Sequence, residues 1–113
     1  MPESCLFCRI VRKEIPAKFV LENEHVVAFR DTDPKAPTHV LIVPKQHVAG
    51  LNDATSAEML GEMMLAAAAI ARSEGLTEGG YRAVVNSGRD GGQSVHHVHL
   101  HLLGGRKMAW PPG

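Results

Sequence analysis

The sequence predicts an α+β domain in which helices cover an antiparallel sheet. Five short apolar segments rich in β-branched residues have the composition of strands, and short links join successive strands, as in antiparallel sheets. A longer segment carries Met and Ala at helical intervals. Because the 113-residue chain has no internal repeat or linker, we expect one domain spanning 1–113.

The first half of the chain is expected to form a short helix and three strands. Ser4 is a suitable N-cap for a helix over residues 5–13. Residues 19–22 and 26–30 have the pattern of two strands joined as a hairpin. A loop with two prolines follows, and residues 39–43 then resume as an apolar strand.

The second half is expected to form a long helix and two more strands. Thr55 and Glu58 have the spacing of a capping box, and the helical pattern continues to Gly75. We interpret its Met and Ala stripe as core rather than as a ligand surface, because a helix that covers a sheet needs such a face. The last strands are predicted at 81–86 and 97–103.

The composition argues against two classes of partner. Twelve Lys and Arg balance twelve Asp and Glu, so no polybasic surface is expected to bind nucleic acid or an anionic membrane. No apolar run approaches the roughly 20 residues that a membrane span needs, and the N-terminus lacks the pattern of a secretory signal. We therefore expect a cytoplasmic protein.

Three histidines at two-residue spacing, His97, His99 and His101, are the strongest chemical signal. In a strand their imidazoles would line one face, while the apolar residues between them line the other. Such a row suits attack on phosphorus, with His99 as nucleophile and its neighbours at the phosphoryl oxygens. The nucleophile needs an acceptor for its second N–H, and a backbone carbonyl could serve.

A glycine-rich connection, Gly91-Gly92-Gln93-Ser94, lies just before these histidines. Clustered backbone N–H groups in such a loop can bind an anion without net positive charge. An ordinary loop is the alternative, but three nearby imidazoles favour phosphate binding.

Cys5 and Cys8 form a Cys-x-x-Cys pair, and the chain has no other cysteine. In a reducing compartment this spacing indicates metal or redox chemistry more than a structural disulfide. A redox Cys-x-x-Cys pair is expected between a strand and a helix. No strand is predicted before Cys5, so the redox interpretation is disfavoured. A metal site, or two small core residues, therefore remain as interpretations.

Several motifs together resemble the histidine triad superfamily. Residues 97–103 are similar to its His-x-His-x-His motif followed by two apolar residues. Residues 12–18, 36–39, 90–94 and 104–113 resemble its nucleotide-binding branch, the purine nucleoside phosphoramidases. The resemblance implies a five-stranded antiparallel sheet with two helices, continued across a homodimer, whose tail reaches the partner subunit's active site.

The resemblance also implies a reaction and its catalytic residues. The reaction is hydrolysis of the P–N bond of an adenosine or guanosine 5′-phosphoramidate through a nucleotidyl-histidine, with no metal required for catalysis. His99 would be the nucleophile, and His97 and His101 would contact the phosphate oxygens and the leaving group. His39 would support the nucleophile by hydrogen bonding, and Ser94 would hydrogen-bond the leaving group.

Nucleotide contacts follow from the same resemblance. Asp31 would accept hydrogen bonds from the ribose hydroxyls, with bracing of a turn as the alternative. Phe29 would form part of the purine pocket, with a plain core role as the alternative. Trp110 would belong to the tail that reaches the partner, or be an incidental apolar residue. The remaining implied contacts are Leu6, Ile10, Ile15, Thr32, Asn86, Gly92, Gln93, Ser94, Val95, His99 and His101.

A structural zinc site is a separate implication. Relatives that begin with a similar Cys-x-x-Cys can hold Zn²⁺ with two histidines, which here would be His47 and His97 beside Cys5 and Cys8. His97 would then serve both the metal and the mechanism.

Two other functions stay open at this point. One is hydrolysis of dinucleoside polyphosphates, as in a sister branch, which Ser94 and the Trp-Pro-Pro-Gly ending disfavour. The other is a non-catalytic nucleotide-binding or zinc-stabilised module. Leu6, Arg30, Thr32 and His96 depart from residues common in the family, so the resemblance does not choose the base or the amine.

Overall fold

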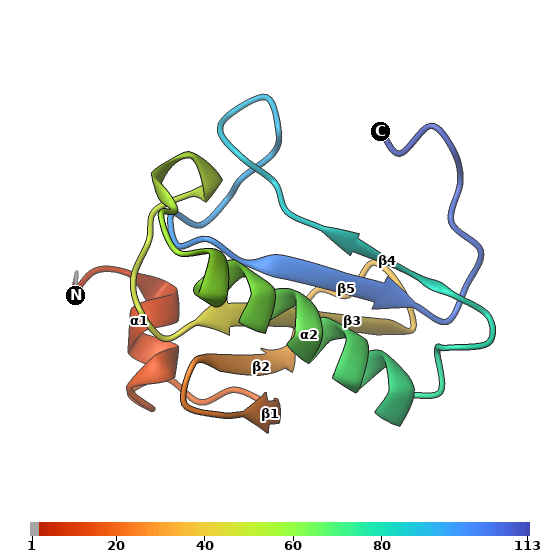
Figure 1. The fold of residues 1–113 in the computed structure, drawn as a ribbon, viewed down its shortest axis with the longest axis horizontal. Helices are drawn as coiled ribbons and strands as arrows, with labels where there is room; N and C mark the ends of the chain where they lie inside the picture. The colour runs from red at the N-terminus through yellow and green to blue at the C-terminus, as the bar shows by residue number, and fades with distance from the viewer. Residues whose placement is uncertain (1–2) are drawn as a thin grey trace.

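The computed structural model describes residues 3–113; the first two residues of the predicted domain lie outside that range. The elements follow the predicted order, with one 3₁₀ turn added before the long helix (Figure 1). Their bounds are α1 Leu6–Val11, β1 Phe19–Glu22, β2 Val26–Arg30, β3 Thr38–Pro44, η1 Leu51–Asp53, α2 Ala57–Ser73, β4 Tyr81–Val84 and β5 Leu100–Gly104.

All five strands join one antiparallel sheet in the order β1-β2-β3-β5-β4, which confirms the predicted fold. The predicted hairpin forms because Asn23 Oδ1 accepts hydrogen bonds from the backbone N–H groups of His25 (2.8 Å) and Val26 (2.9 Å). β1 and β4 are the outer strands, so each leaves one edge without a strand partner in the described residues 3–113.

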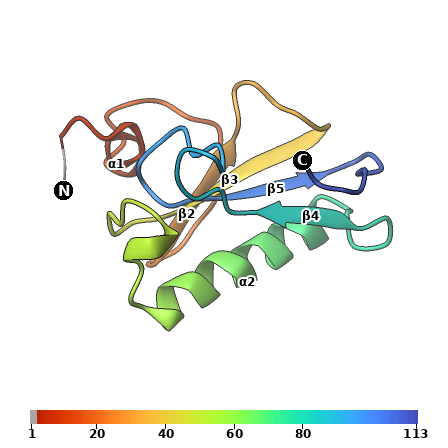
Figure 2. The same cartoon turned by 90° about the horizontal axis from the view of Figure 1, so that it is seen from above.

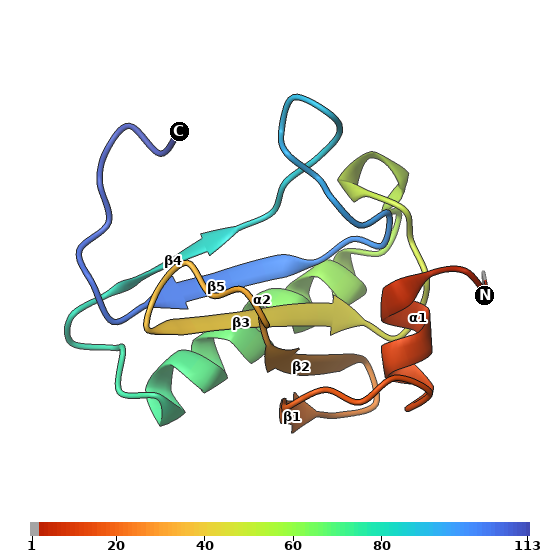
Figure 3. The same ribbon diagram turned by 180° about the vertical axis from the view of Figure 1, so that it is seen from behind.

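The two helices lie on opposite faces of the sheet. Figure 2 shows α2 along one face and α1 on the other, and Figure 3 shows the α1 side directly. Alternating side chains of β2 and β3 supply both cores: Val26, Ala28, Val40 and Ile42 pack with α2, and Val27, Phe29, Leu41 and Val43 pack with α1. No helix within residues 3–113 is long and apolar enough to cross a membrane.

Both helices begin at a cap other than the predicted one. Cys5, not Ser4, is the N-cap of α1, and its Sγ accepts from the N–H of Cys8 at 3.4 Å. Ser56, not Thr55, caps α2, and its side chain accepts from the N–H of Met59 at 3.0 Å. Thr and Ser both cap helices well, so their adjacency indicates a start without choosing the residue.

The last strand is shorter than predicted. It begins at Leu100, because Val98 donates its N–H to Val48 O (2.7 Å) in a loop rather than to a neighbouring strand. His97 and His99 therefore precede the sheet, and only His101 of the three lies in it. β4 likewise ends at Val84 rather than at residue 86.

Candidate active site

A cavity of about 950 Å³ opens on the sheet face that carries α1. Apolar side chains form much of its wall, and two imidazoles lie among them, which is the usual composition of a small-molecule site. The predicted site residues that line it are Leu6, Ile10, Ile15, Phe29, Asp31, Thr32, Ser94, Val95, His99 and His101.

Some lining residues were not predicted: Phe7, Pro16, Ala17, Lys18, Arg30, Pro34 and Leu41. Two of these had a signal in the sequence. Phe7 is three residues from Ile10 and so shares its side of the helix. Leu41 shares a face with His39 by strand alternation, but its place opposite Phe29 depends on the pairing of β2 with β3.

Other predicted contacts lie away from the cavity wall, namely Asn86, Gly92, Gln93 and Trp110. The Gln93 amide donates to Ala49 O (2.7 Å) and Val95 O (3.1 Å), and its oxygen accepts from Gly88 N (3.0 Å). It therefore braces the glycine-rich loop. Trp110 is 80% exposed in the tail.

Strand pairing places His101 on the cavity side, and the ring of His99 lies beside it. His101 lies opposite Leu41 in the β3–β5 pair, and Leu41 belongs to the core formed with α1. The His99 ring lies 5.0 Å from that of His101 and 5.0 Å from Phe7, measured between centroids. The two imidazoles thus share one side, as predicted, although His99 precedes the strand.

The proton on His99 is fixed by the backbone. Its Nδ1 lies 2.7 Å from the carbonyl oxygen of His97, which can only accept a hydrogen bond, so Nδ1 carries the proton. The lone pair is then on Nε2. This is the arrangement predicted for a nucleophile, with a backbone carbonyl as the acceptor.

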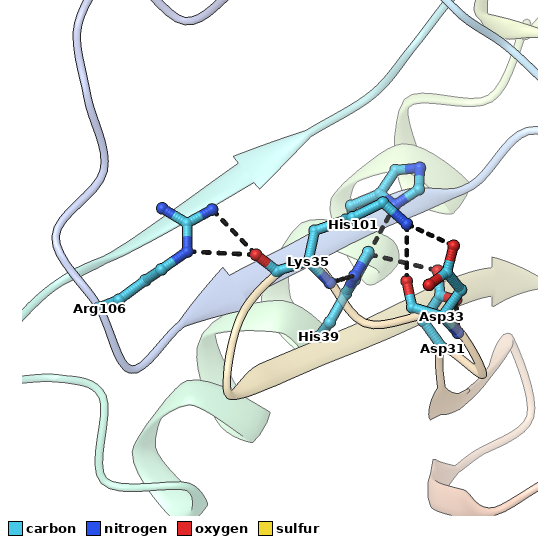
Figure 4. Close-up of polar contacts among 6 residues, drawn as sticks. All are labelled: Asp31, Asp33, Lys35, His39, His101 and Arg106. Carbon is cyan, nitrogen blue, oxygen red and sulfur yellow. Dashed lines mark hydrogen bonds and ion pairs between the residues drawn. The ribbon is translucent and has the colours of Figure 1, made fainter.

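His101 is oriented by His39 in a different way. The N–H of Lys35 donates to His39 Nδ1 at 3.0 Å, so neutral His39 carries its proton on Nε2 (Figure 4). That Nε2 lies 2.9 Å from His101 Nδ1 and donates to it. His101 therefore carries its own proton on Nε2, where it can donate to a ligand.

The role predicted for His39 needs correction, and the alternative role given for Asp31 is observed. His39 contacts His101 rather than the nucleophile, because the β3–β5 pairing brings its ring beside residue 101. Asp31 does brace a turn, since its Oδ1 accepts from the N–H of Asp33 at 2.8 Å. Its Oδ2 lies 3.4 Å from His39 Nε2, so the same carboxylate also adjoins the histidine pair.

Burial keeps these imidazoles neutral. Desolvation lowers the pKa of His39 and His99 below the usual value of a histidine, more than the nearby Asp31 carboxylate raises them. Desolvation, then the neighbouring His99 and His39, lowers the pKa of His101 to about 4. At neutral pH the site therefore holds neutral rings, each with one donor and one acceptor nitrogen.

Of the two places predicted for the His97 ring, the structure has the one beside Cys5, Cys8 and His47 and not the one at the phosphate. The ring is fully buried and does not line the cavity. Its Nε2 donates to Pro44 O at 2.8 Å, which leaves the Nδ1 lone pair facing Cys5 Sγ (3.4 Å) and Cys8 Sγ (3.5 Å). His97 therefore cannot contact a phosphoryl oxygen with its side chain, because the bend before β5 turns the ring toward α1.

This cysteine–histidine cluster has the shape of a zinc site. Cys8 Sγ lies 3.3 Å from His47 Nδ1, and the two Nδ1 atoms of His47 and His97 are 3.2 Å apart. In a zinc tetrahedron, ligand distances of about 2.3 Å to sulfur and about 2.0–2.1 Å to nitrogen place neighbouring ligand atoms about 3.3–3.8 Å apart. The hydrogen bond from His97 to Pro44 O is also the kind that orients a metal-binding imidazole.

A second group of possible ligands, Asp31, His39 and His101, fits a metal poorly. His39 Nδ1 accepts the N–H of Lys35, so its Nε2 holds a proton where a metal would need a lone pair. Hydrogen bonding, rather than metal binding, accounts for this group.

Comparison with known proteins gives a consistent result. A model of the HIT domain matches residues 12–108. The chain is 52% identical to the 14 kDa zinc-binding protein of Zea mays, with 96% of this chain and 87% of that protein covered. It is 46% identical to the purine nucleoside phosphoramidase of Escherichia coli K12, with 96% and 92% covered.

Solved structures agree with the sequence comparison. A HIT family hydrolase from Legionella pneumophila has a TM-score of 0.95 and 53% identity, with 97% of this chain and 100% of that chain covered. A zinc-bound histidine triad family protein from Mycobacterium smegmatis has a TM-score of 0.83 and 33% identity, with 91% and 76% covered.

The buried histidines predict how stability depends on pH. His39, His97, His99 and His101 all have lowered pKa values, so below about pH 6.5 the unfolded chain binds protons that the folded chain does not. The free energy of unfolding should fall as pH decreases from 6.5, with the His101 contribution continuing to about 4. Urea unfolding at pH 7.5, 6 and 5 measures this; equal stability at all three would contradict it.

Proposed function

Because this chain belongs to the HIT domain family, we propose that it is a purine nucleoside phosphoramidase. It hydrolyses the P–N bond of adenosine or guanosine 5′-phosphoramidates and releases the nucleoside monophosphate and an amine. The observation that carries this proposal is the His99 ring: its Nδ1–H is held by His97 O, and its Nε2 is left with a lone pair at a largely apolar cavity.

In the first step, His99 Nε2 attacks phosphorus and the P–N bond of the substrate breaks. The departing nitrogen needs a proton, and the hydroxyl of Ser94, which lines the cavity, supplies one and recovers it from solvent. In the second step, water attacks phosphorus, the bond to His99 breaks, and the water proton passes to solvent. The ring keeps its Nδ1–H throughout, so His97 O stabilises the positive charge on the nucleotidyl-imidazole.

His101 supplies a hydrogen-bond donor to a phosphoryl oxygen. Its Nδ1 is occupied by His39, so its Nε2–H is the group directed at a ligand. Because burial holds its pKa at about 4, it donates as a neutral imidazole and keeps that proton. A fixed donor of this kind can stabilise charge that develops on the phosphoryl group.

The purine and ribose fit the remaining walls. Phe7 and Phe29 make an edge-to-face pair with centroids 5.6 Å apart, and Ile10 and Ile15 adjoin the same core, which offers an apolar slot for a flat base. Asp31 would accept from the ribose hydroxyls through the carboxylate that the turn holds in place. The proposal keeps four further nucleotide contacts that lie outside this wall, namely Asn86, Gly92, Gln93 and Trp110.

We also propose that the cysteine–histidine cluster binds one structural zinc ion through Cys5, Cys8, His47 and His97. The four ligand atoms lie within 4.8 Å of one another. Burial, followed by its hydrogen bond with Cys5, raises the pKa of the Cys8 thiol to about 11, so a bound cation is needed to keep its thiolate. Zinc would tie α1 to the segment before β5. A cytoplasmic location suits this site, because reduced thiols persist there.

A homodimer joined along β4 completes the proposal. Among residues 3–113, one edge of β4 has no strand partner, and its Tyr81 and Ala83 are exposed on the sheet face that carries α2. Met64 and Leu65 of α2 are also exposed, at 53% and 67%. An open edge beside exposed apolar side chains favours strand pairing between two copies, which would bring the tail with Trp110 toward the partner.

The nucleophile is tested by His99→Asn. This variant should lower turnover of an adenosine phosphoramidate by about 10³-fold or more, because no covalent intermediate forms, while AMP still binds. His96→Asn is the matched control, since His96 is exposed and lies outside the cavity wall.

Three outcomes would contradict the proposal. The wild type could fail to hydrolyse the phosphoramidate, as a non-catalytic module would. It could prefer diadenosine polyphosphate, as a relative from the sister branch would. The His99→Asn variant could also keep the wild-type rate.

The zinc site is tested by metal analysis of tag-free protein. Wild type and the control His25→Ala should each hold about one zinc per chain, whereas His47→Ala should lose it. Of these two histidines, only His47 belongs to the cysteine–histidine cluster. Thermal unfolding should shift to lower temperature after chelation in the first two proteins. Zinc-free wild type with unchanged stability after zinc addition would refute the site.

The dimer is tested by light scattering. Wild type should have twice the 12.2 kDa chain mass, and Leu65→Lys should shift the population toward monomer, because it places a charge in the proposed interface. Leu51→Lys is the control, since Leu51 is similarly apolar and exposed but lies outside α2 and β4. A monomeric wild type, or equal effects of both substitutions, would argue against this interface.

A further inference from the structure

Arg106 makes an unusual contact with the loop between β2 and β3. Its Nε and Nη2 both donate to the carbonyl oxygen of Lys35, at 3.1 and 2.9 Å (Figure 4). No carboxylate lies in ion-pair range of Arg106 within residues 3–113. Two N–H groups of the planar guanidinium thus donate to one backbone oxygen. The third nitrogen, Nη1, donates to Lys107 O at 3.2 Å.

Close chain packing brings Arg106 to that loop. β5 ends at Gly104, and Gly105 follows with a φ of +92°, a backbone conformation that residues other than glycine rarely adopt. A Cβ on Gly105 would lie 2.8 Å from Pro37 Cβ, so only glycine lets the chain pass this closely over the loop. The segment after the strand of the catalytic histidines is therefore held against the loop that leads into β3.

Lys35, whose carbonyl accepts from Arg106, also determines the proton position on His39 through its N–H. The Lys35 N–H donates to His39 Nδ1 at 3.0 Å, and His39 Nε2 then donates to His101 Nδ1 at 2.9 Å. The carbonyl and the N–H of Lys35 flank one Cα atom, so anchoring the first restricts the direction of the second. Lys35 is exposed, and its side chain makes its polar contacts within residues 3–113 with Asp33 alone.

We propose that Arg106 is a positioning residue for catalysis, which acts through the Lys35 backbone to keep the proton of His39 on Nε2 and that of His101 directed at the substrate. This inference rests on the proposed function for its kinetic consequence, but the proton positions can be observed without turnover. Without Arg106, the Lys35 N–H can turn away from His39. His39 can then carry its proton on Nδ1, and its Nε2 would accept from His101.

Reversed proton positions on His39 and His101 would weaken catalysis where His101 contacts the substrate. His101 would present a lone pair, instead of an N–H, to the phosphoryl oxygen, and two acceptors would face each other. Binding of the base would be largely unaffected, because its slot is formed by Phe7 and Ile10 of α1 and Phe29 of β2, outside the loop that holds Lys35. The expected effect is therefore on kcat rather than on KM.

The test compares Arg106→Ala with Arg106→Lys and with Lys107→Ala. Lys107→Ala removes a neighbouring exposed charge whose side chain is not in the site. Arg106→Ala should lower kcat for the phosphoramidate roughly 10- to 100-fold with little change in KM, as small misplacement of catalytic groups does. Arg106→Lys should restore part of the rate, because it keeps the charge and a donor but not the fork.

Nitrogen-15 NMR of the histidine rings gives the independent readout. In wild type, His39 Nδ1 should appear as a non-protonated nitrogen; in Arg106→Ala it should shift toward the protonated form, with Lys107→Ala unchanged. An unaltered His39 signal in Arg106→Ala, or a kcat equal to that of Lys107→Ala, would overturn the proposal. If the wild type proved inactive, the proposed function would fail, and the His39 signal would still decide the role of Arg106.

Discussion

The hydrogen bond from His99 Nδ1 to the carbonyl oxygen of His97 connects most of the features described here. The residue that supplies the carbonyl has its own ring in the cysteine–histidine cluster, with Nε2 held by Pro44 O. One residue thus serves two sites with different atoms: its side chain belongs to the cluster, and its backbone orients the nucleophile. The double role expected from the sequence therefore involves no competition for a single ring.

Backbone groups place the protons of His99 and His39, and the two kinds of group give opposite results. A carbonyl next to Nδ1 places the proton there in His99, whereas an N–H next to Nδ1 places it on Nε2 in His39. The nucleophile consequently presents a lone pair, and His101 presents a donor. Because burial keeps these rings neutral, these assignments hold at neutral pH.

Residue pattern alone predicted the sheet, the helices and the face shared by His99 and His101, because these depend on local periodicity. The resemblance supplied most of the cavity residues. The resemblance placed the His97 ring in the cysteine–histidine cluster, but residue pattern put it on the face of His99 and His101, because it could not show the bend fixed by a long-range bond from Val98 N to Val48 O. The roles of Lys35 and Arg106 also depend on a bond from the Arg106 side chain to a backbone oxygen 71 positions away, and a backbone acceptor leaves no signature in residue types.

The central claim is that the backbone leaves His99 Nε2 as the reactive nitrogen of the proposed phosphoramidase. The most direct measurement is phosphorus–nitrogen coupling in the nucleotidyl intermediate of protein with nitrogen-15 histidine, trapped by rapid denaturation during turnover. We expect coupling to Nε2 of His99, with Nδ1 still protonated before the trap. Coupling to Nδ1, or to any other histidine, would contradict this account.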